Sequence, residues 1–219
     1  MLKRITLLAR RDDLTFDEFS NHWFTVHGDI VKDMPMVHGY IQNPIKARLL
    51  TALNAENPFS FDGIVELWFK DQAAQDVAFA ADAAKLLPKD ELNFIRGITI
   101  FPVTEDRSGP EGLPVKVIIA ARFGDGSDRG QDNTKALVGQ LAALDGVQVV
   151  SVNHLDEVGW REHLWHEPLA PNALIELGFD SEGALDAFAG LSGLADIYAS
   201  LTDGNGVLEA YQVSPRRII

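Results

Sequence analysis

Two side chains suited to acid–base chemistry lie near each other in the first quarter of the sequence, His27 and Tyr40. An imidazole takes up or releases a proton near neutral pH, which carboxylates and amines do less readily. A phenol can donate a hydrogen bond to a carbonyl or phenolate oxygen. These residue types are compatible with proton transfer on a small molecule, carried by His27. The alternatives are a helix-edge histidine bonded to a carbonyl or to solvent, and a tyrosine whose hydroxyl only reaches the edge of the core.

His27 belongs to a helix that the sequence predicts over residues 15–34. Thr15 and Glu18 match a capping box, in which each side chain satisfies a free backbone amide of the first turn. Apolar residues then recur at helical spacing: Phe16, Phe19, Trp23, Val26 and Ile30. His27 falls at the border of this stripe, so its ring is expected to reach the side that faces the sheet. His22 falls on the opposite flank and is expected at the surface.

Polar side chains on two predicted strands are further candidates. Tyr40 and Asn43 lie three residues apart on a strand over 37–44, so they are expected on opposite faces unless a bulge reorients one. Glu66 alternates with apolar neighbours on a strand over 64–69. Inside a closed barrel, burial would raise the pKa of Glu66 and allow it to carry a proton. Facing the helices or water, it would instead be paired with an arginine.

A second concentration of aromatic and polar residues lies at 160–167 and includes His163, His166 and Glu167. These types can bind a metal, but two histidines three apart without a fixed third ligand are a weak signal for one. A long loop with aromatic residues is more simply expected to cover a pocket at a barrel mouth. We predict no metal and no cofactor, and the sequence lacks a P-loop and a Gly-x-Ser-x-Gly motif.

Composition narrows the class of protein. The 219 residues carry 19 Lys and Arg against 32 Asp and Glu, a net charge of -13 that disfavours nucleic acid and anionic membranes. The absence of cysteine excludes disulfides and cysteine nucleophiles. No apolar stretch approaches the roughly 18 residues of a membrane helix, and the run at 5–9 is too short for an export signal. We expect a soluble, cytoplasmic protein with no nucleic-acid or membrane partner.

The chain contains an internal repeat. The segments that align are 63–80 with 173–189, shifted by 110 positions at the start and 109 at the end, 98–103 with 208–213, shifted by 110, and 3–10 with 115–122, shifted by 112. The alignment places Glu66 opposite Glu176 in the same apolar frame. Two copies of one unit are therefore expected to meet in the intervening Gly- and Pro-rich stretch.

The repeat sets the predicted organisation of the chain. We predict a first unit over 1–105, a linker over 106–114 and a second unit over 115–219. Each has the ferredoxin-like order βαββαβ, and the helices of the second unit are predicted near 134–144 and 181–200. A four-stranded sheet with both helices on one face needs a cover for its other face, so we expect a pseudo-dimeric α+β barrel with an apolar interior. The alternative is two independent domains.

Ordered residues of the first unit form a specific pattern: Phe19, Trp23 and His27 on a helix, Tyr40 and Asn43 on a strand, and Asp62-Gly63 before the next strand. This pattern resembles the EthD family. The resemblance implies a dimeric α+β barrel fold, shared with small cofactor-free monooxygenases, polyketide cyclases and dehydratases, and it implies no single reaction. The helix predicted at 134–144 holds neither Trp nor His, so only the first half is expected to retain a site.

These features predict a cofactor-independent enzyme of the lyase, dehydratase or isomerase type that acts on a small apolar, aromatic or polyketide-like molecule inside the barrel. His27 and Tyr40 would be its catalytic residues. The residues expected to bind the substrate are Phe19, Trp23, His38, Asn43, Glu66, Trp68 and Phe101. The rival predictions are a cofactorless monooxygenase of phenols and a non-catalytic binding or accessory protein. A homodimer of the fused chain is left open.

Overall fold

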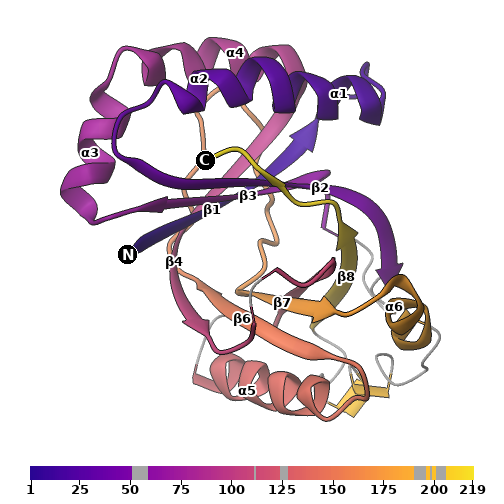
Figure 1. Ribbon diagram of the computed structural model, residues 1–219. Coiled ribbons are helices and arrows are strands. Elements are labelled where there is room, and N and C mark those ends of the chain that lie inside the picture. Colours follow the sequence, from indigo (N-terminus) through magenta and orange to yellow (C-terminus); the bar gives the residue numbers. More distant parts are fainter. Residues whose placement is uncertain (51–58, 111, 124–127, 190–195, 198, 201–205) are drawn as a thin grey trace.

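A computed structural model describes residues 1–50, 59–110, 112–123, 128–189, 196–197, 199–200 and 206–219, and they form a mixed α+β structure (Figure 1). The strands are β1 (Leu2–Arg10), β2 (Val37–Leu50), β3 (Gly63–Phe69), β4 (Ile95–Arg107), β5 (Val115–Arg122), β6 (Gln148–Leu155), β7 (Ala173–Phe179), β8 (Val207–Val213) and β9 (Arg216–Arg217). The helices are α1 (Phe16–His22), the π turn η1 (Trp23–His27), α2 (Gly28–Lys32), α3 (Gln72–Ala80), the 3-10 turn η2 (Ala83–Leu86), α4 (Leu87–Phe94), α5 (Asp128–Ala142) and α6 (Glu182–Ala189).

The strands form one closed antiparallel barrel. Among the described residues, hydrogen bonds connect eight of them in the order β3-β1-β4-β6-β7-β5-β8-β2, and β2 pairs with β3 to complete the ring. Each half contributes four neighbouring strands, in the order β2-β3-β1-β4 and β6-β7-β5-β8. The halves are joined by the pairs β4–β6 and β2–β8. The α+β barrel is therefore confirmed, and the alternative of two independent domains is wrong.

Most predicted elements form close to their expected bounds. The helix predicted over 15–34 begins with the expected capping box, in which the Glu18 amide donates to Thr15 Oγ1 at 3.2 Å and the Thr15 amide donates to Glu18 Oε2 at 2.7 Å. It ends at Lys32 and contains a π turn that the sequence did not reveal. Strand β4 continues to Arg107, so the predicted linker begins as a strand. None of the described helices is long and apolar enough to span a bilayer.

The second half departs further from its predicted helix bounds. Helix α5 begins at Asp128, before the predicted 134, and ends at Ala142. Helix α6 occupies the start of the helix predicted over 181–200, and most of the rest of that segment lies outside the described residues.

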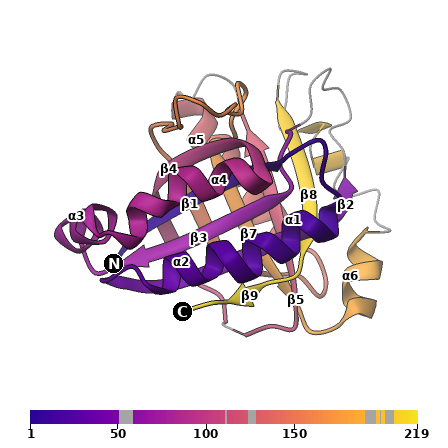
Figure 2. The ribbon, with the colours of Figure 1, turned by 90° about the horizontal axis from the view of Figure 1, so that it is seen from above.

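Alternation along the strands sorts the buried side chains into layers, because successive residues of a strand point to opposite faces. One cluster draws on strands of both halves and fills the barrel interior, with Ile5, Leu7, Ile64, Phe101, Ile118, Leu174 and Tyr211. A second cluster lies between the first-half strands and helices α1, α2, α3 and α4, which spread over one side of the barrel (Figure 2). A third lies between the second-half strands and helices α5 and α6.

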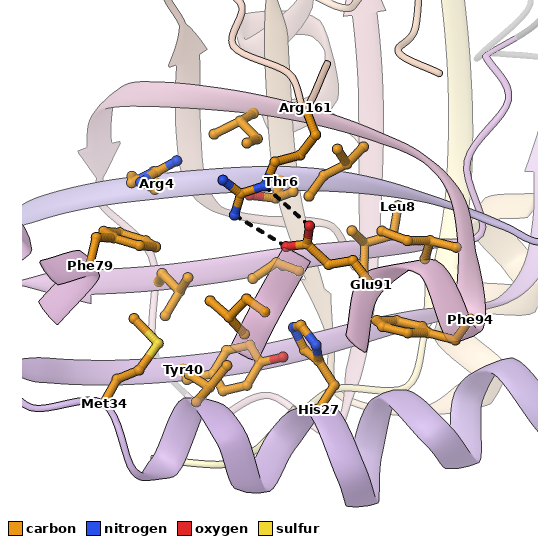
Figure 3. A pocket seen from close by; sticks show the side chains of 17 residues that line it. Arg4, Thr6, Leu8, His27, Met34, Tyr40, Phe79, Glu91, Phe94 and Arg161 are labelled. Carbon is orange, nitrogen blue, oxygen red and sulfur yellow. Dashed lines mark hydrogen bonds and ion pairs between the residues drawn. The ribbon is translucent and has the colours of Figure 1, made fainter. Parts of the chain in front are cut away.

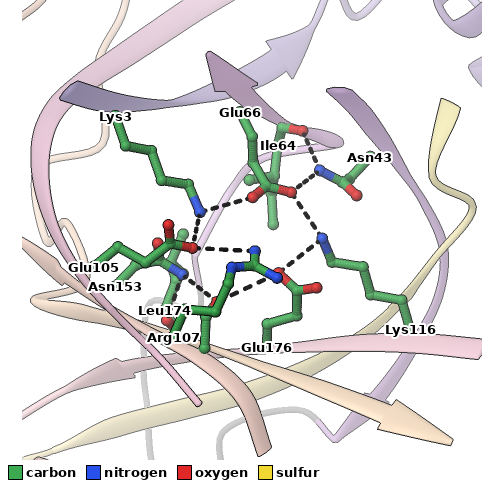
Figure 4. Close-up of polar contacts among 11 residues, drawn as sticks. Lys3, Asn43, Ile64, Glu66, Glu105, Arg107, Lys116, Asn153, Leu174 and Glu176 are labelled. Carbon is green, nitrogen blue, oxygen red and sulfur yellow. Dashed lines mark hydrogen bonds and ion pairs between the residues drawn. The ribbon is translucent and has the colours of Figure 1, made fainter. Parts of the chain in front are cut away.

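Ion pairs replace apolar packing at one end of the interior (Figure 4). Lys3 Nζ lies 2.8 Å from Glu66 and 2.7 Å from Glu105. Lys116 Nζ lies 2.7 Å from Glu66 and 3.0 Å from Glu176. Burial acts to raise the pKa of Glu66, but the ammonium groups of Lys116 and Lys3 outweigh it and hold the pKa well below its ordinary value. The raised pKa expected for Glu66 is wrong, and the interior is not wholly apolar.

The ion pairs make the charge of Glu66 important for stability. Glu66→Gln removes the carboxylate that Lys3 and Lys116 share, so it should lower the free energy of unfolding by roughly 3 kcal/mol in urea titrations at neutral pH. Asp82→Asn is the matched control, because it breaks the exposed pair between Asp82 and Lys85 and should cost at most about 0.5 kcal/mol. Equal, small losses in the two variants would contradict this account.

Candidate functional site

A cleft lies outside the barrel, between the helices of the first half and the outer face of β1, β3 and β4 (Figure 3). Its volume is about 50 Å³ and most of its walls are aliphatic or aromatic. The polar side chains that line it are Arg4, Thr6, His27, Tyr40, Glu91 and Arg161. The cleft therefore brings an imidazole, a phenol and two guanidinium groups to one apolar space.

His27 reaches this cleft because of the π turn. His22 Nε2 lies 2.8 Å from Asp90 Oδ1, and His27 Nδ1 lies 2.9 Å from Asp90 Oδ2. In a regular α-helix, residues five apart are separated by roughly 140° around the axis. The wider π turn η1 places them nearly one turn apart, so both imidazoles face the same carboxylate on α4. The expectation that His22 lies on the opposite flank from His27 is wrong for this reason, although its side chain remains partly exposed.

The charge state of Asp90 fixes the role of the two ring nitrogens of His27. Burial acts to raise the pKa of Asp90, but the hydrogen bonds with His27 and His22 outweigh it and hold the pKa below its ordinary value. An ionised carboxylate only accepts hydrogen bonds, so Nδ1 of His27 must donate. Nε2 of the neutral ring is then free to accept a proton, and it has no hydrogen-bond partner in the described part of the chain. Figure 3 shows the ring directed into the cleft.

Tyr40 has the complementary role of a hydrogen-bond donor. Its hydroxyl accepts hydrogen bonds from Trp23 Nε1 at 3.0 Å and from Gln42 Nε2 at 2.9 Å. The Gln42 amide is held in this orientation because the same Nε2 donates to the Trp23 carbonyl at 2.7 Å. Burial raises the pKa of Tyr40, so the phenol stays protonated at neutral pH. With both lone pairs of its oxygen occupied, the hydroxyl can offer only its proton to a ligand in the cleft.

A loop from the second half, residues 156–172, reaches across to this cleft. The Ile98 amide donates to the Trp165 carbonyl at 2.8 Å, and a Cβ on Gly97 would lie 2.5 Å from the Trp165 ring, so this close approach needs glycine. The loop delivers Arg161, whose Nε and Nη2 lie 3.1 and 3.2 Å from the two oxygens of Glu91. The second half therefore contributes a side chain to the site of the first.

Two of the three residues weighed as metal ligands in this loop, His166 and Glu167, have other partners, and His163 is exposed. His166 stacks on Trp160 with ring centroids 4.9 Å apart. Glu167 accepts a hydrogen bond from the Ser60 amide at 2.7 Å. Within the described residues, no group of three His, Cys, Asp or Glu side chains is arranged to hold a metal ion.

The sheet divides the predicted site residues between its two faces. Tyr40 faces the helices and Asn43 faces the barrel interior, where it donates to Glu66 at 2.9 Å, so the expectation of opposite faces is confirmed. Phe19 and Trp23 are buried near His27 under the helices. Phe101 belongs to the interior cluster. A single interior chamber lined by all of these residues was therefore a wrong expectation.

Two other predicted residues lie at the mouth of the barrel. His38 and Trp68 line an open cavity of about 830 Å³ there, and Lys3 and Glu66 contribute to its inner wall. Lys3 Nζ lies 4.9 Å from the centre of the Trp68 ring. These residues are separated by the sheet from His27 and Tyr40, so they form a different surface.

Sequence reasoning missed Arg4, Glu91 and Arg161, which line the cleft, and Asp90, which bonds to His27. Asp90 lies in a short helical piece without a motif, and its meeting with His27 depends on how α4 packs on η1. Arg161 lies in the aromatic-rich loop that the sequence did single out. No motif or sequence spacing indicates that it contacts Glu91 in the other half.

Comparison with known proteins identifies the family of the first half and agrees with the barrel fold. Residues 11–97 match the EthD domain family. The first half of the chain contains an EthD domain. An anthrone oxidase-like protein of known structure superposes with a TM-score of 0.60 at 13% identity, covering 99% of this chain and 93% of that one. A candidate monooxygenase from Fusobacterium nucleatum superposes with a TM-score of 0.53 at 10% identity, covering 97% and 91%. At these identities the likeness establishes the fold alone, and no curated protein matches the sequence.

The environment of Asp90 predicts a pH dependence of stability. Because its pKa is depressed in the folded protein, its stabilising contribution is present above the ordinary aspartate pKa of about 3.9 and is lost as the pH falls through the depressed value. The melting temperature of Asp90→Asn should therefore fall less than that of the wild type between about pH 5 and pH 3. The control Asp29→Asn changes an exposed aspartate and should follow the wild type. An Asp90→Asn curve parallel to the wild type would refute the argument.

Proposed function

We propose that the protein is a cofactor-independent acid–base enzyme, and that its active site is the cleft between helices and sheet of the EthD half. The observation that carries this proposal is the orientation of His27, whose Nδ1 is bonded to Asp90 and whose Nε2 is left free toward the cleft. A carboxylate that orients an imidazole in this way makes it an effective general base. The reaction class is a lyase, dehydratase or isomerase.

The steps follow from the two polar groups at the floor of the cleft. His27 Nε2 accepts a proton from a carbon next to a substrate carbonyl, and the electron pair of that bond moves onto the carbonyl oxygen. The Tyr40 hydroxyl donates a hydrogen bond to this developing enolate oxygen. The imidazolium then returns its proton, either to another carbon in an isomerisation or to a departing hydroxyl in a dehydration. Neither route requires an added oxidant or cofactor.

The dimensions of the cleft constrain how a substrate enters. A volume of about 50 Å³ holds only a few water molecules, so an aromatic substrate must displace side chains. Arg4, Phe79 and Arg161 form the partly exposed rim, whereas His27 and Tyr40 are buried. Long side chains at a partly exposed rim change rotamer rapidly, so we propose that the substrate enters between these three.

A cofactorless monooxygenase is the second candidate. One structural neighbour is anthrone oxidase-like and another is a candidate monooxygenase. The same base would deprotonate a phenol or anthrone, and molecular oxygen would then react with the electron-rich carbanion. A binding protein without turnover is the third candidate, and it needs the apolar cleft but not the oriented Nε2.

We also propose that the two halves are copies of one ferredoxin-like unit, over 1–105 and 115–219, joined by 106–114. Matched polar contacts support this: the pairs are Asn43 with Asn153, Ile64 with Leu174, Glu66 with Glu176 and Lys3 with Lys116. Asn43 Nδ2 donates to the Ile64 carbonyl at 3.1 Å, and Asn153 Nδ2 donates to the Leu174 carbonyl at 3.2 Å. In the strand pairing, Ile5 lies opposite Glu66 and Ile118 lies opposite Glu176. The first strands of the two halves therefore match with an offset of 113 positions, from 5 to 118. This corrects the offset of 112 that the sequence alignment predicted.

His27→Asn tests the proposed function most simply. The assay follows a panel of aromatic β-hydroxyketones and 1,3-diketones by absorbance, and oxygen uptake by electrode. Against any substrate turned over by the wild type, we expect His27→Asn to lower kcat about a hundredfold or more, because the general base is lost. His38→Asn is the control, since this exposed histidine lies at the barrel mouth and should leave kcat unchanged.

The outcomes separate the three candidates. Turnover without oxygen uptake supports the lyase or isomerase class, and turnover with stoichiometric oxygen uptake identifies the monooxygenase. Unchanged kcat in His27→Asn, or equal losses in both histidine variants, would refute the role of His27. Binding without turnover of any bound ligand would establish the binding protein.

A further inference from the structure

Arg4 extends from β1 into the same cleft as His27, and no carboxylate in the described part of the chain pairs with it. Its guanidinium packs over the Phe79 ring, 4.7 Å from the ring centre. The side chain is partly buried, and an arginine remains charged at neutral pH. Charged groups that are withdrawn from water are normally paired with an opposite charge, and Arg4 has no such counter-ion among the described residues.

The other charged groups of the rim do not neutralise Arg4. Glu91 is occupied by the two hydrogen bonds from Arg161. Arg161 uses Nε and Nη2 for this pair, which leaves Nη1 for another acceptor. Burial, and then the nearby charge of Arg161, lower the pKa of Arg4 from its ordinary value. The entrance of the cleft therefore holds two guanidinium groups and the carboxylate of Glu91, which is bonded to Arg161 and leaves Arg4 without a counter-ion among the described residues.

We propose that Arg4 and Arg161 together bind a carboxylate of the substrate, so that the enzyme acts on a carboxylate-bearing apolar or aromatic molecule. This inference rests on the proposed function only in assigning the cleft to a substrate. A carboxylate fits because a planar guanidinium donates two parallel hydrogen bonds to its oxygens. One half of the chain supplies Arg4 and the other supplies Arg161, so recognition depends on both halves.

The arrangement of the cleft orients such a substrate. Figure 3 shows Arg4 and Arg161 on the side of the cleft opposite His27 and Tyr40. Apolar side chains, including Leu67 and Ile100, line the space with them. With its carboxylate held by the arginines, the carbon skeleton of the ligand would lie against these side chains and point toward Nε2 of His27. The pair would therefore determine which substrate carbon faces the base.

A binding experiment with two probes of nearly equal shape tests this inference without any need for turnover. Benzoate and its neutral isostere benzamide are titrated into the full chain by calorimetry or ligand-observed NMR. We expect the wild type to bind benzoate about tenfold or more tightly than benzamide, because hydrogen bonds to a charged group are the stronger ones. A net charge of -13 disfavours non-specific binding of anions, so a preference for benzoate must come from local cations.

Substitutions assign the preference to the rim. Arg4→Met should abolish the preference for benzoate while benzamide still binds, which shows that the cleft is intact, and Arg4→Lys should retain part of it. The control Arg216→Met removes a guanidinium that packs over the Phe24 ring, 5.1 Å from its centre, outside the cleft, and should keep the full preference. His27→Asn should also keep it, so a failed reaction mechanism remains distinguishable from failed recognition.

Two results would overturn the inference. One is a wild type that does not prefer benzoate, whether it binds both probes equally or neither. The other is an Arg4→Met variant, or an Arg4→Gln variant if the first does not fold, that retains the wild-type preference.

Discussion

Each strand of a closed barrel has one face toward a shared interior and one face toward the surrounding helices, and this alternation separates the polar groups of the protein. Lys3 faces the interior, where it pairs with Glu66, whereas the next residue, Arg4, faces the helices and the cleft. Tyr40 and Asn43 are divided in the same way. Ion pairs and apolar side chains fill much of the interior, whereas His27 and Tyr40 line the cleft on the helix-covered face of the first half.

The site on that face combines a local irregularity with a long-range contact. The π turn aligns His22 and His27, and α4 brings Asp90 between them. Phe94, one turn along the same helix, packs against both imidazoles with ring centroids 5.0 Å away in each case. The second half lacks an equivalent histidine on its first helix, yet its loop supplies Arg161 to the cleft. The two halves thus have different roles around one cleft.

The sequence predicted the fold well because its signals are local and periodic. The capping box at Thr15 and the alternation along the strands each specify an element, and the closed barrel follows from covering two apolar sheet faces. The candidate base, His27, was identified from its place in the EthD-like pattern together with its position beside the apolar stripe. Its neighbour His22 was misplaced, because a regular helix was assumed where the structure has a π turn.

The rest of the site could not be predicted, because it depends on contacts between distant segments. Asp90 lies 63 positions from His27 and Arg161 lies 70 positions from Glu91, and neither pair has a spacing that indicates a contact. The direction of the pKa shift of Glu66 could not be predicted either. Burial alone would raise this pKa, and only the folded barrel shows the two lysines that lower it. Sequence patterns specified which face a residue occupies more reliably than which groups it meets.

The tautomer of His27 tests the central claim most directly. Nitrogen-15 NMR of the imidazole ring, with the signals assigned by comparison with His27→Asn, distinguishes a proton on Nδ1 from one on Nε2. At a pH where the ring is neutral, the hydrogen bond to the ionised Asp90 predicts that Nδ1 carries the proton and that Nε2 is unprotonated. A proton on Nε2 would contradict the account, because the nitrogen that faces the cleft would then be unable to accept one.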